Sequence, residues 1–196
     1  LTANFMSMQS SIKVACVGLG YIGRMVCEAL ISENPFYNQK LELIGVVDIV
    51  PESRVWAEKK NLKAFSSIRE LVDYIKPDVC IHTTASNMES VVDQLKELLA
   101  AKIPVVSSAE ELFFPWVTKP KLALELNSEC EKAGVAVLGT GVNPGFVMDV
   151  LLAAHKHVHK ARRVDLVREA FLKQAQVQAA RIAVQRDGLT GASQHQ

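Results

Sequence analysis

The sequence predicts an α/β fold, in which helices cover both faces of a doubly wound, mostly parallel sheet. Two observations support this prediction. Short apolar, β-branched runs alternate along the chain with segments of helical periodicity. The first apolar run also ends in a glycine-rich turn that leads directly into a helix-like segment.

The first elements of the alternation are two strands and two helices. The runs at 12–19 and 41–48 predict strands buried on both faces, because their apolar residues follow one another without alternation. The segments 21–33 and 51–60 predict helices. Pro51 suits the first helical turn, where no N–H donor is needed.

Serines placed three residues before a glutamate predict capping boxes at helix starts. The pairs are Ser67 with Glu70, Ser86 with Glu89, and Ser108 with Glu111. The first two open helices expected at 68–75 and 87–101.

The second half of the alternation repeats the pattern of the first. Apolar runs predict strands at 78–84, 103–108 and 135–139. The amphipathic segment 121–134 predicts a helix that stops at its terminal glycine. His82 alternates with apolar neighbours in its strand, so we expect a hydrogen-bonded histidine of the core.

The first glycine-rich turn, GLGYIG, is a GxGxxG motif between a strand and a helix. Gly18 permits the tight turn, Gly20 lets the backbone approach a pyrophosphate, and Gly23 allows close packing of helix on strand. Tyr21 and Ile22 complete the motif, and the helix start offers free N–H groups to phosphates. We therefore expect a Rossmann-type domain whose motif residues bind NAD or NADP.

Asp48, which ends the second strand, bears on the choice of cofactor. Its carboxylate would accept hydrogen bonds from the adenosine ribose and repel a 2′-phosphate, which slightly favours NAD. Arg54 lies close enough in the sequence to weaken that preference.

A second glycine-rich turn, VLGTGVNPGF at 137–146, follows the last strand of the series. Pro144 holds the preceding residue extended and suits the first turn of a helix expected to reach about Val158. Ligands of doubly wound sheets lie at the carboxyl ends of the strands. We therefore expect Asn143 and Gly145 to bind substrate, with a plain strand-to-helix connection as the alternative.

Glu110 and Glu111 are the candidate catalytic residues, because they lie at a strand's carboxyl end. A carboxylate there could hold a substrate ammonium or relay its proton. The capping box explains Glu111 equally well, so both interpretations stay open for this pair.

Composition excludes several classes of function. The net charge of +1 gives no field for nucleic acid or anionic lipid, and no apolar run has the length of a membrane span. The four scattered cysteines are expected to be buried residues of a cytoplasmic protein. His155, His157 and His159 lack nearby additional ligands, so we expect a basic helix end and no metal site.

Three stretches together, GLGYIG, VVSSAEELFFPW and GTGVNPGFVMD, resemble the 2,4-diaminopentanoate dehydrogenase family within the dihydrodipicolinate reductase-like amino-acid dehydrogenases. The resemblance covers about residues 12–169. It implies NAD(P)-dependent oxidative deamination of 2,4-diaminopentanoate to 2-amino-4-oxopentanoate, with an amino-acid substrate and a homo-oligomeric protein. It also implies that five residues border the cofactor: Thr83, Thr84, Ser107, Thr140 and Gly141.

The resemblance also predicts the domain organisation. We expect an NAD(P)-binding domain at 12–158 and the truncated beginning of an α+β substrate domain at 159–196. Dihydrodipicolinate reductases proper carry paired histidines where this chain has Phe171 and Leu172, which argues against that activity. The alternatives are a non-catalytic nucleotide-binding module, as a fragment or decayed paralogue, or a dihydrodipicolinate reductase-like imine reductase.

Overall fold

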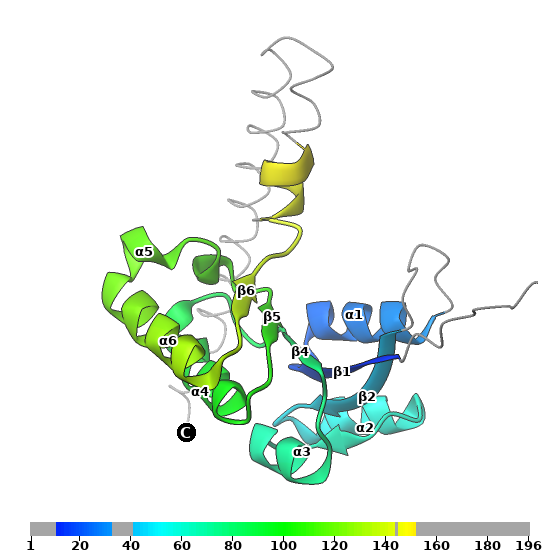
Figure 1. Ribbon diagram of the computed structural model, residues 1–196. Coiled ribbons are helices and arrows are strands. Elements are labelled where there is room, and N and C mark those ends of the chain that lie inside the picture. The colour runs from blue at the N-terminus through cyan, green and yellow to red at the C-terminus, as the bar shows by residue number, and fades with distance from the viewer. Residues whose placement is uncertain (1–10, 33–40, 144, 152–196) are drawn as a thin grey trace, which may run out of the picture. The chain divides into compact units, whose positions relative to one another are not determined.

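A single six-stranded sheet organises the computed structural model, which describes residues 11–32, 41–143 and 145–151 (Figure 1). All strand pairs are parallel, and the strand order is β3-β2-β1-β4-β5-β6. The strands are β1 (Ile12–Val17), β2 (Leu41–Val47), β3 (Ala64–Phe65), β4 (Val79–His82), β5 (Val105–Ser107) and β6 (Val137–Gly139). This confirms the predicted α/β class. The order reverses between β1 and β4, which is the switch point of a doubly wound sheet.

Helices occupy the connections between these strands, as the alternation predicted. They are α1 (Tyr21–Ile31), α2 (Pro51–Lys59), α3 (Ile68–Tyr74), α4 (Met88–Ala100), α5 (Pro115–Thr118) and α6 (Pro120–Ala133). A 3₁₀ turn, η1 (Glu110–Leu112), follows β5, and a π-helical turn, η2 (Phe146–Val150), follows β6.

Two apolar clusters hold the helices to the sheet. One joins β1, β4 and β5 to α3, α4 and α6, with Leu71, Leu95 and Leu126 among its members. The other joins β1 and β2 to α1 and α2 through Cys16, Cys27 and other buried side chains. Successive side chains of a strand point to opposite faces, so neighbouring residues of β1 enter different clusters. Cys16, Cys27 and Cys80 are buried free thiols, as the sequence predicted. The prediction is wrong for Cys130, which lies on α6 and is half-buried.

Local capping follows the prediction at one helix and departs from it at two. The Ser67 hydroxyl accepts a hydrogen bond from the Glu70 N–H at 3.1 Å and caps α3. The capping box predicted at Ser86 is wrong, because Asn87 caps α4 by accepting from the N–H of Ser90. The box at Ser108 is also wrong: the segment is the short η1 turn, and no side chain caps it.

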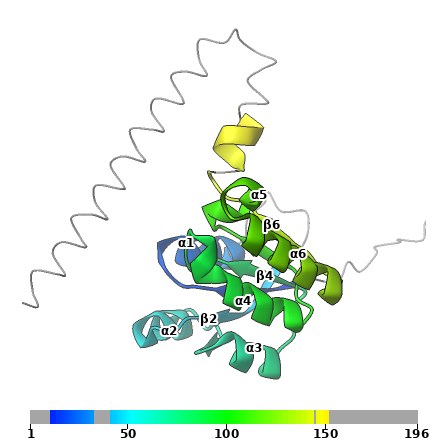
Figure 2. The same ribbon diagram turned by 90° about the vertical axis from the view of Figure 1, so that its left-hand side faces the viewer.

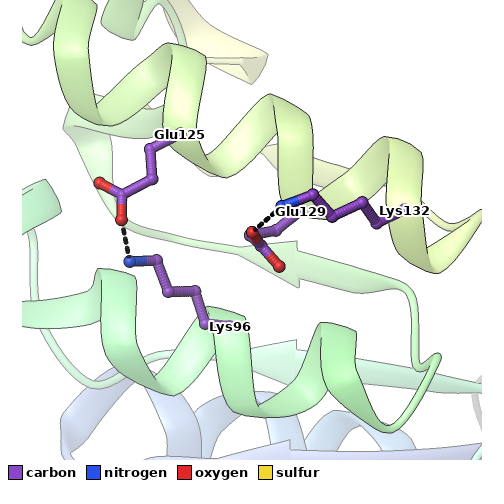
Figure 3. Close-up of polar contacts among 4 residues, drawn as sticks. All are labelled: Lys96, Glu125, Glu129 and Lys132. Atoms are coloured by element: carbon purple, nitrogen blue, oxygen red, sulfur yellow. Dashed lines mark hydrogen bonds and ion pairs between the residues drawn. The ribbon is translucent and has the colours of Figure 1, made fainter.

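Helices α4 and α6 lie side by side in both views of the molecule (Figures 1 and 2). Lys96 of α4 forms an ion pair with Glu125 of α6, and Glu129 pairs with Lys132 within α6 (Figure 3). These partly exposed pairs contribute little individually. The apolar contacts of the larger cluster therefore account for most of this packing.

Contacts divide the chain into two compact units, Leu1–Phe146 and Val147–Gln196. The domain boundary predicted at residue 158 lies outside the described residues and stays a prediction. The expected helix end near Val158, the histidines at 155–159 and the departure at 164–174 lie outside the described residues.

Candidate functional site

The GxGxxG turn after β1 is a close-packed backbone structure. Gly18 has a φ of +94°, which L side chains rarely adopt, and an added Cβ would lie 2.9 Å from the Thr83 carbonyl oxygen. A Cβ at Gly23 would lie 1.9 Å from the Gly18 oxygen. These two glycines therefore hold α1 and β4 against the turn, in the roles that the sequence predicted.

Gly20 differs from its two neighbours in the motif. A Cβ built there meets no atom within 4 Å, and Gly20 is the residue that precedes the first turn of α1. Tyr21 is 79% exposed and Ile22 is 47% exposed at the same helix start. The backbone at Gly20 is thus open to a ligand, beside helix N–H groups that attract anions.

Asp48 follows β2 and binds the glycine turn directly. Its Oδ2 accepts a hydrogen bond from the Leu19 N–H at 2.6 Å. Its Oδ1 accepts from the Val50 N–H at 2.8 Å, in the loop that leads to α2. Asp48 follows the second strand, as the sequence predicted, but these two backbone contacts were not foreseen, and its role in ribose binding stays a prediction.

Two arginines lie at the same junction of β1 and β2. Arg24 donates from Nε to the Leu19 oxygen at 2.9 Å. Arg54 donates from Nη1 to the Asp48 oxygen at 2.7 Å and to the Ile49 oxygen at 2.9 Å. Sequence reasoning missed Arg24, although a cation one residue after the third glycine of the motif was an available signal.

The carboxyl end of β4 meets the glycine turn through Thr83. Its hydroxyl donates to the Gly18 oxygen at 2.8 Å, and its N–H donates to the Val17 oxygen at 2.8 Å. The exposed Thr84 hydroxyl donates to Gln94 Oε1 at 2.8 Å. Both threonines therefore lie at the switch point of the sheet, where ligands bind in doubly wound folds. The family resemblance implies that they border a cofactor there.

His82 is a fully buried core residue, as predicted, and lies beneath these threonines. Its Nε2 lies 2.7 Å from Gln94 Oε1, and its Nδ1 lies 3.1 Å from the Ser107 hydroxyl. Burial lowers the pKa of the imidazole, and the hydrogen bond to Gln94 opposes that shift. The neutral ring satisfies both contacts by donating from Nε2 and accepting at Nδ1.

Ser107, at the end of β5, has its hydroxyl turned to His82 and is fully buried. The Oγ also accepts from the Ala109 N–H at 3.2 Å. The hydroxyl thus supports the strand end from within the core, and its predicted contact with a cofactor stays a prediction.

Glu110 and Glu111 occupy the η1 turn but have different surroundings. Glu111 Oε2 accepts from the Met88 N–H at 2.8 Å, so it binds the first turn of α4 and not its own turn. Glu110 is exposed. A Cβ at Gly139 would lie 2.5 Å from the Leu112 carbonyl carbon, so η1 packs closely on the end of β6.

The second glycine-rich turn begins at this contact and closes on itself. Thr140 donates its N–H to the Ser107 oxygen at 2.9 Å, which extends the pairing of β5 with β6. Gly141 forms a bridge with Gly145, and the Phe146 N–H donates to the Gly141 oxygen at 3.0 Å. Gly145 has a φ of +126°, and Asn143 is half-buried.

The described ranges bring most predicted site residues to the carboxyl edge of the sheet. The first turn, Asp48 and Thr83 contact one another directly. Within these ranges, no helix has the length and apolar character needed to cross a membrane. No group of three or more histidine, cysteine, aspartate or glutamate residues in the described part could hold a metal ion.

Comparison with known proteins places this edge in a family context. Residues 12–140 match the GFO/IDH/MocA model, an oxidoreductase family with an NAD-binding Rossmann fold. The chain is 30% identical over 152 residues to 2,4-diaminopentanoate dehydrogenase of Acetoanaerobium sticklandii, covering 72% of this chain and 41% of that enzyme. It therefore spans about two fifths of the length of this curated relative.

Two solved structures share the fold at lower identity. An amine dehydrogenase from Mycobacterium smegmatis matches with a TM-score of 0.64 and 19% identity, over 77% of this chain and 45% of that one. The WlbA dehydrogenase from Bordetella pertussis, solved with NADH and UDP-GlcNAcA, matches with a TM-score of 0.58 and 21% identity, over 76% of this chain and 42% of that one.

Proposed function

Because the chain belongs to the GFO/IDH/MocA oxidoreductase family, we propose that it is the nucleotide-binding part of an NAD(P)-dependent dehydrogenase acting on an amino-acid C–N bond. The proposed reaction is oxidative deamination of 2,4-diaminopentanoate to 2-amino-4-oxopentanoate. The similarity to a 2,4-diaminopentanoate dehydrogenase supports this choice of substrate.

The observation that carries the cofactor assignment is the open backbone at Gly20. A Cβ added at Gly20 would meet no atom within 4 Å, whereas a Cβ at Gly18 or Gly23 would lie less than 3 Å from neighbouring atoms. A pyrophosphate fits this arrangement, because the exposed start of α1 presents N–H groups and a partial positive charge. Asp48, at the end of the second strand, would bind the adenosine ribose.

Residues of the chain would orient the cofactor and leave the redox chemistry to it. When bound, the nicotinamide supplies the hydride acceptor. Gly20 would contact the pyrophosphate, and Thr83 and Thr84 would border the cofactor at the switch point. Thr140 and Gly141 would border it from the end of β6.

On the substrate side, we assign the proton-handling role to Glu110. Glu111 is held by the Met88 N–H, so its part is to position the η1 turn. Glu110 is exposed on the same turn and could hold the substrate ammonium and accept its proton. Leu112 of η1 packs closely on Gly139, at the start of the second glycine turn. We therefore expect Glu110 to act at the same site as Asn143 and Gly145, which would bind the substrate carboxylate.

The cofactor assignment is tested by the Gly20→Val variant. The added side chain enters open space in the folded protein, so the fold should tolerate it. It would occupy the volume that a pyrophosphate needs, and the Kd for NADH should rise about 100-fold, roughly 2.7 kcal/mol. Fluorescence titration of NADH with the wild-type and variant chains measures this. Equal affinities would remove the assignment.

The substrate assignment is tested by nicotinamide reduction in the presence of 2,4-diaminopentanoate, with NAD⁺ and NADP⁺ in turn. Glu110→Gln should lower kcat about 100-fold, within the range of a lost general base. Glu58→Gln, an exposed change at the far end of α2, is the matched control and should leave kcat unchanged. Turnover of other substrates but not of 2,4-diaminopentanoate would remove the substrate assignment, and turnover that Glu110→Gln leaves unchanged would remove the role of Glu110.

A further inference from the structure

Three charged side chains, Asp48, Arg24 and Arg54, lie at the junction of β1, β2 and α2. Asp48 has both carboxylate oxygens engaged by backbone N–H groups, at 2.6 Å from Leu19 and 2.8 Å from Val50. These bonds tie the glycine turn to the loop before α2. Asp48 thus has a role in loop structure, and its carboxylate stays charged. Whether the junction accepts a 2′-phosphate therefore depends on the cations around Asp48.

Arg24 is held at this junction by three contacts. Besides the bond to the Leu19 oxygen, its Nη2 donates to the Ser53 hydroxyl in α2 at 3.3 Å. The guanidinium also lies 5.2 Å from the ring centroid of Trp56. A guanidinium stacked and bonded in this way loses little further entropy when it binds an anion.

Arg54 approaches the same junction from α2. Its Nη1 binds the Asp48 and Ile49 carbonyl oxygens, and no partner is found for its Nη2 among the described residues. The Nη1 of Arg24 likewise has no partner in this part of the chain. Both arginines therefore contact the short segments at Leu19 and Asp48 and keep donors for a further ligand. Two acidic groups oppose them. Asp48 lies at the same junction, and Glu70 is a neighbour of Arg54, because hydrogen bonds from Ser66 and, to a smaller extent, the charge of Arg54 lower the pKa of Glu70.

We propose that Arg24 and Arg54 bind the 2′-phosphate of NADP(H), so that the chain binds NADP(H) more tightly than NAD(H). The proposal rests on the nucleotide site proposed above, and it reverses the slight preference for NAD that Asp48 predicted. Guanidinium groups suit a phosphate because their forked donors match its oxygens. In Rossmann folds the 2′-position of the ribose lies at the end of the second strand. Arg54 bonds to the Asp48 oxygen there, and Arg24 bonds to the oxygen of Leu19, whose N–H binds Asp48.

Two nucleotides that differ only in the 2′-phosphate provide the direct test. Calorimetric titration of the 196-residue chain should show 2′,5′-ADP binding about tenfold tighter than 5′-AMP, as expected for charge-assisted hydrogen bonds. In Arg54→Gln and Arg24→Gln the ratio of the two affinities should fall toward one. Arg54→Lys keeps the charge without the fork and should retain part of the ratio.

Lys132→Gln is the control for a general effect of net charge on nucleotide binding. It removes one cation from α6, the helix before β6, and β6 is the edge strand on the side of the sheet away from β2. Its ratio should equal that of the wild type, and thermal melts should show that every variant is folded. Equal affinities for the two nucleotides in the wild type, or a ratio that neither arginine variant changes, would overturn the inference alone. Failure of both nucleotides and of NADH to bind would overturn the proposed function and this inference with it.

Discussion

The two glycine-rich turns at the carboxyl edge of the sheet achieve close backbone approach in different ways. The first turn is braced from neighbouring strands: Thr83 at the end of β4 and Asp48 at the end of β2 both bond to it. The second turn is closed mainly by its own backbone, through the Gly141–Gly145 bridge and the bond from Phe146 to Gly141.

The contacts make the first turn a rigid binding surface, whereas the second turn is a loop whose shape is determined locally. Side chains from two strands and a helix fix the first turn, so its shape depends on the fold of the whole sheet. The shape of the second turn depends on few residues, chiefly on a positive φ at Gly145 and on the packing of Gly139 against Leu112. Changes at the packed glycines of the first turn should therefore disturb the surrounding sheet, and changes in the second turn should leave the shape of the first turn unaltered.

Gly23→Ala should produce the largest effect. The added methyl would lie 1.9 Å from the Gly18 carbonyl oxygen, a backbone atom that cannot move without displacing α1 from β1. We expect a loss of about 3 kcal/mol or more in the free energy of unfolding, at the upper end for overpacking. Urea denaturation followed by circular dichroism measures it.

Gly20→Ala is the matched control for this prediction, because it adds the same methyl to the same turn in open space. Its φ of −66° is ordinary for alanine, so unfolding should change by less than about 1 kcal/mol. Similar losses in the two variants would show that packing of the helix on the turn does not set the stability of this region.

The first turn was predictable because its motif fixes backbone needs at single positions. Gly18, Gly20 and Gly23 have the three different environments that the motif assigns to them. The order of strands and helices was predictable too, because continuous apolar runs signal strands buried on both faces. Five of the six strands lie inside segments that the sequence located.

The remaining features depend on tertiary contacts that leave no local pattern. Strand β3 has two residues and is defined by pairing with Val46 and Val47 of β2. Glu111 satisfied a capping pattern in its own segment, yet α4 offers it the Met88 N–H instead. Arg24 of α1 contacts Ser53 and Trp56 of α2 because the fold places these two helices close together, and no local pattern in the sequence shows this.

Gly145→Ala tests the second turn and should have an intermediate effect. Its φ of +126° strains any L residue, and the new Cβ would lie 2.6 Å from the Thr140 hydroxyl oxygen. We expect the free energy of unfolding, measured by urea denaturation, to fall by about 2 kcal/mol, which is within the range for strained backbone. Gly134→Ala, at a φ of +69° with no atom within 4 Å, isolates the cost of a positive φ and should lose about 1 kcal/mol.

The affinity of Gly145→Ala for NADH separates local from shared effects. If the second turn is determined locally, the first turn keeps its shape and the Kd should stay within about twofold of the wild type. A Kd that rises with the loss of stability would show that the two turns are coupled, contrary to the comparison drawn above.

His82 provides the smallest and most specific test, because β4 and β5 lie between the strands that carry the two turns. Burial lowers the pKa of its imidazole in the folded state, so the unfolded chain binds the proton more readily. The stabilising contribution of neutral His82 is therefore full above the ordinary pKa and is lost as the pH falls below it toward the lowered value. We expect the free energy of unfolding to fall as the pH drops below about 6.5, the ordinary pKa of histidine. In His82→Gln this part of the pH dependence should disappear, and subtracting the two curves cancels the contribution of the other four histidines.

Parallel curves for the two proteins would mean that the link between β4 and β5 does not depend on a neutral imidazole. The middle of the sheet would then join the two turns through backbone pairing alone.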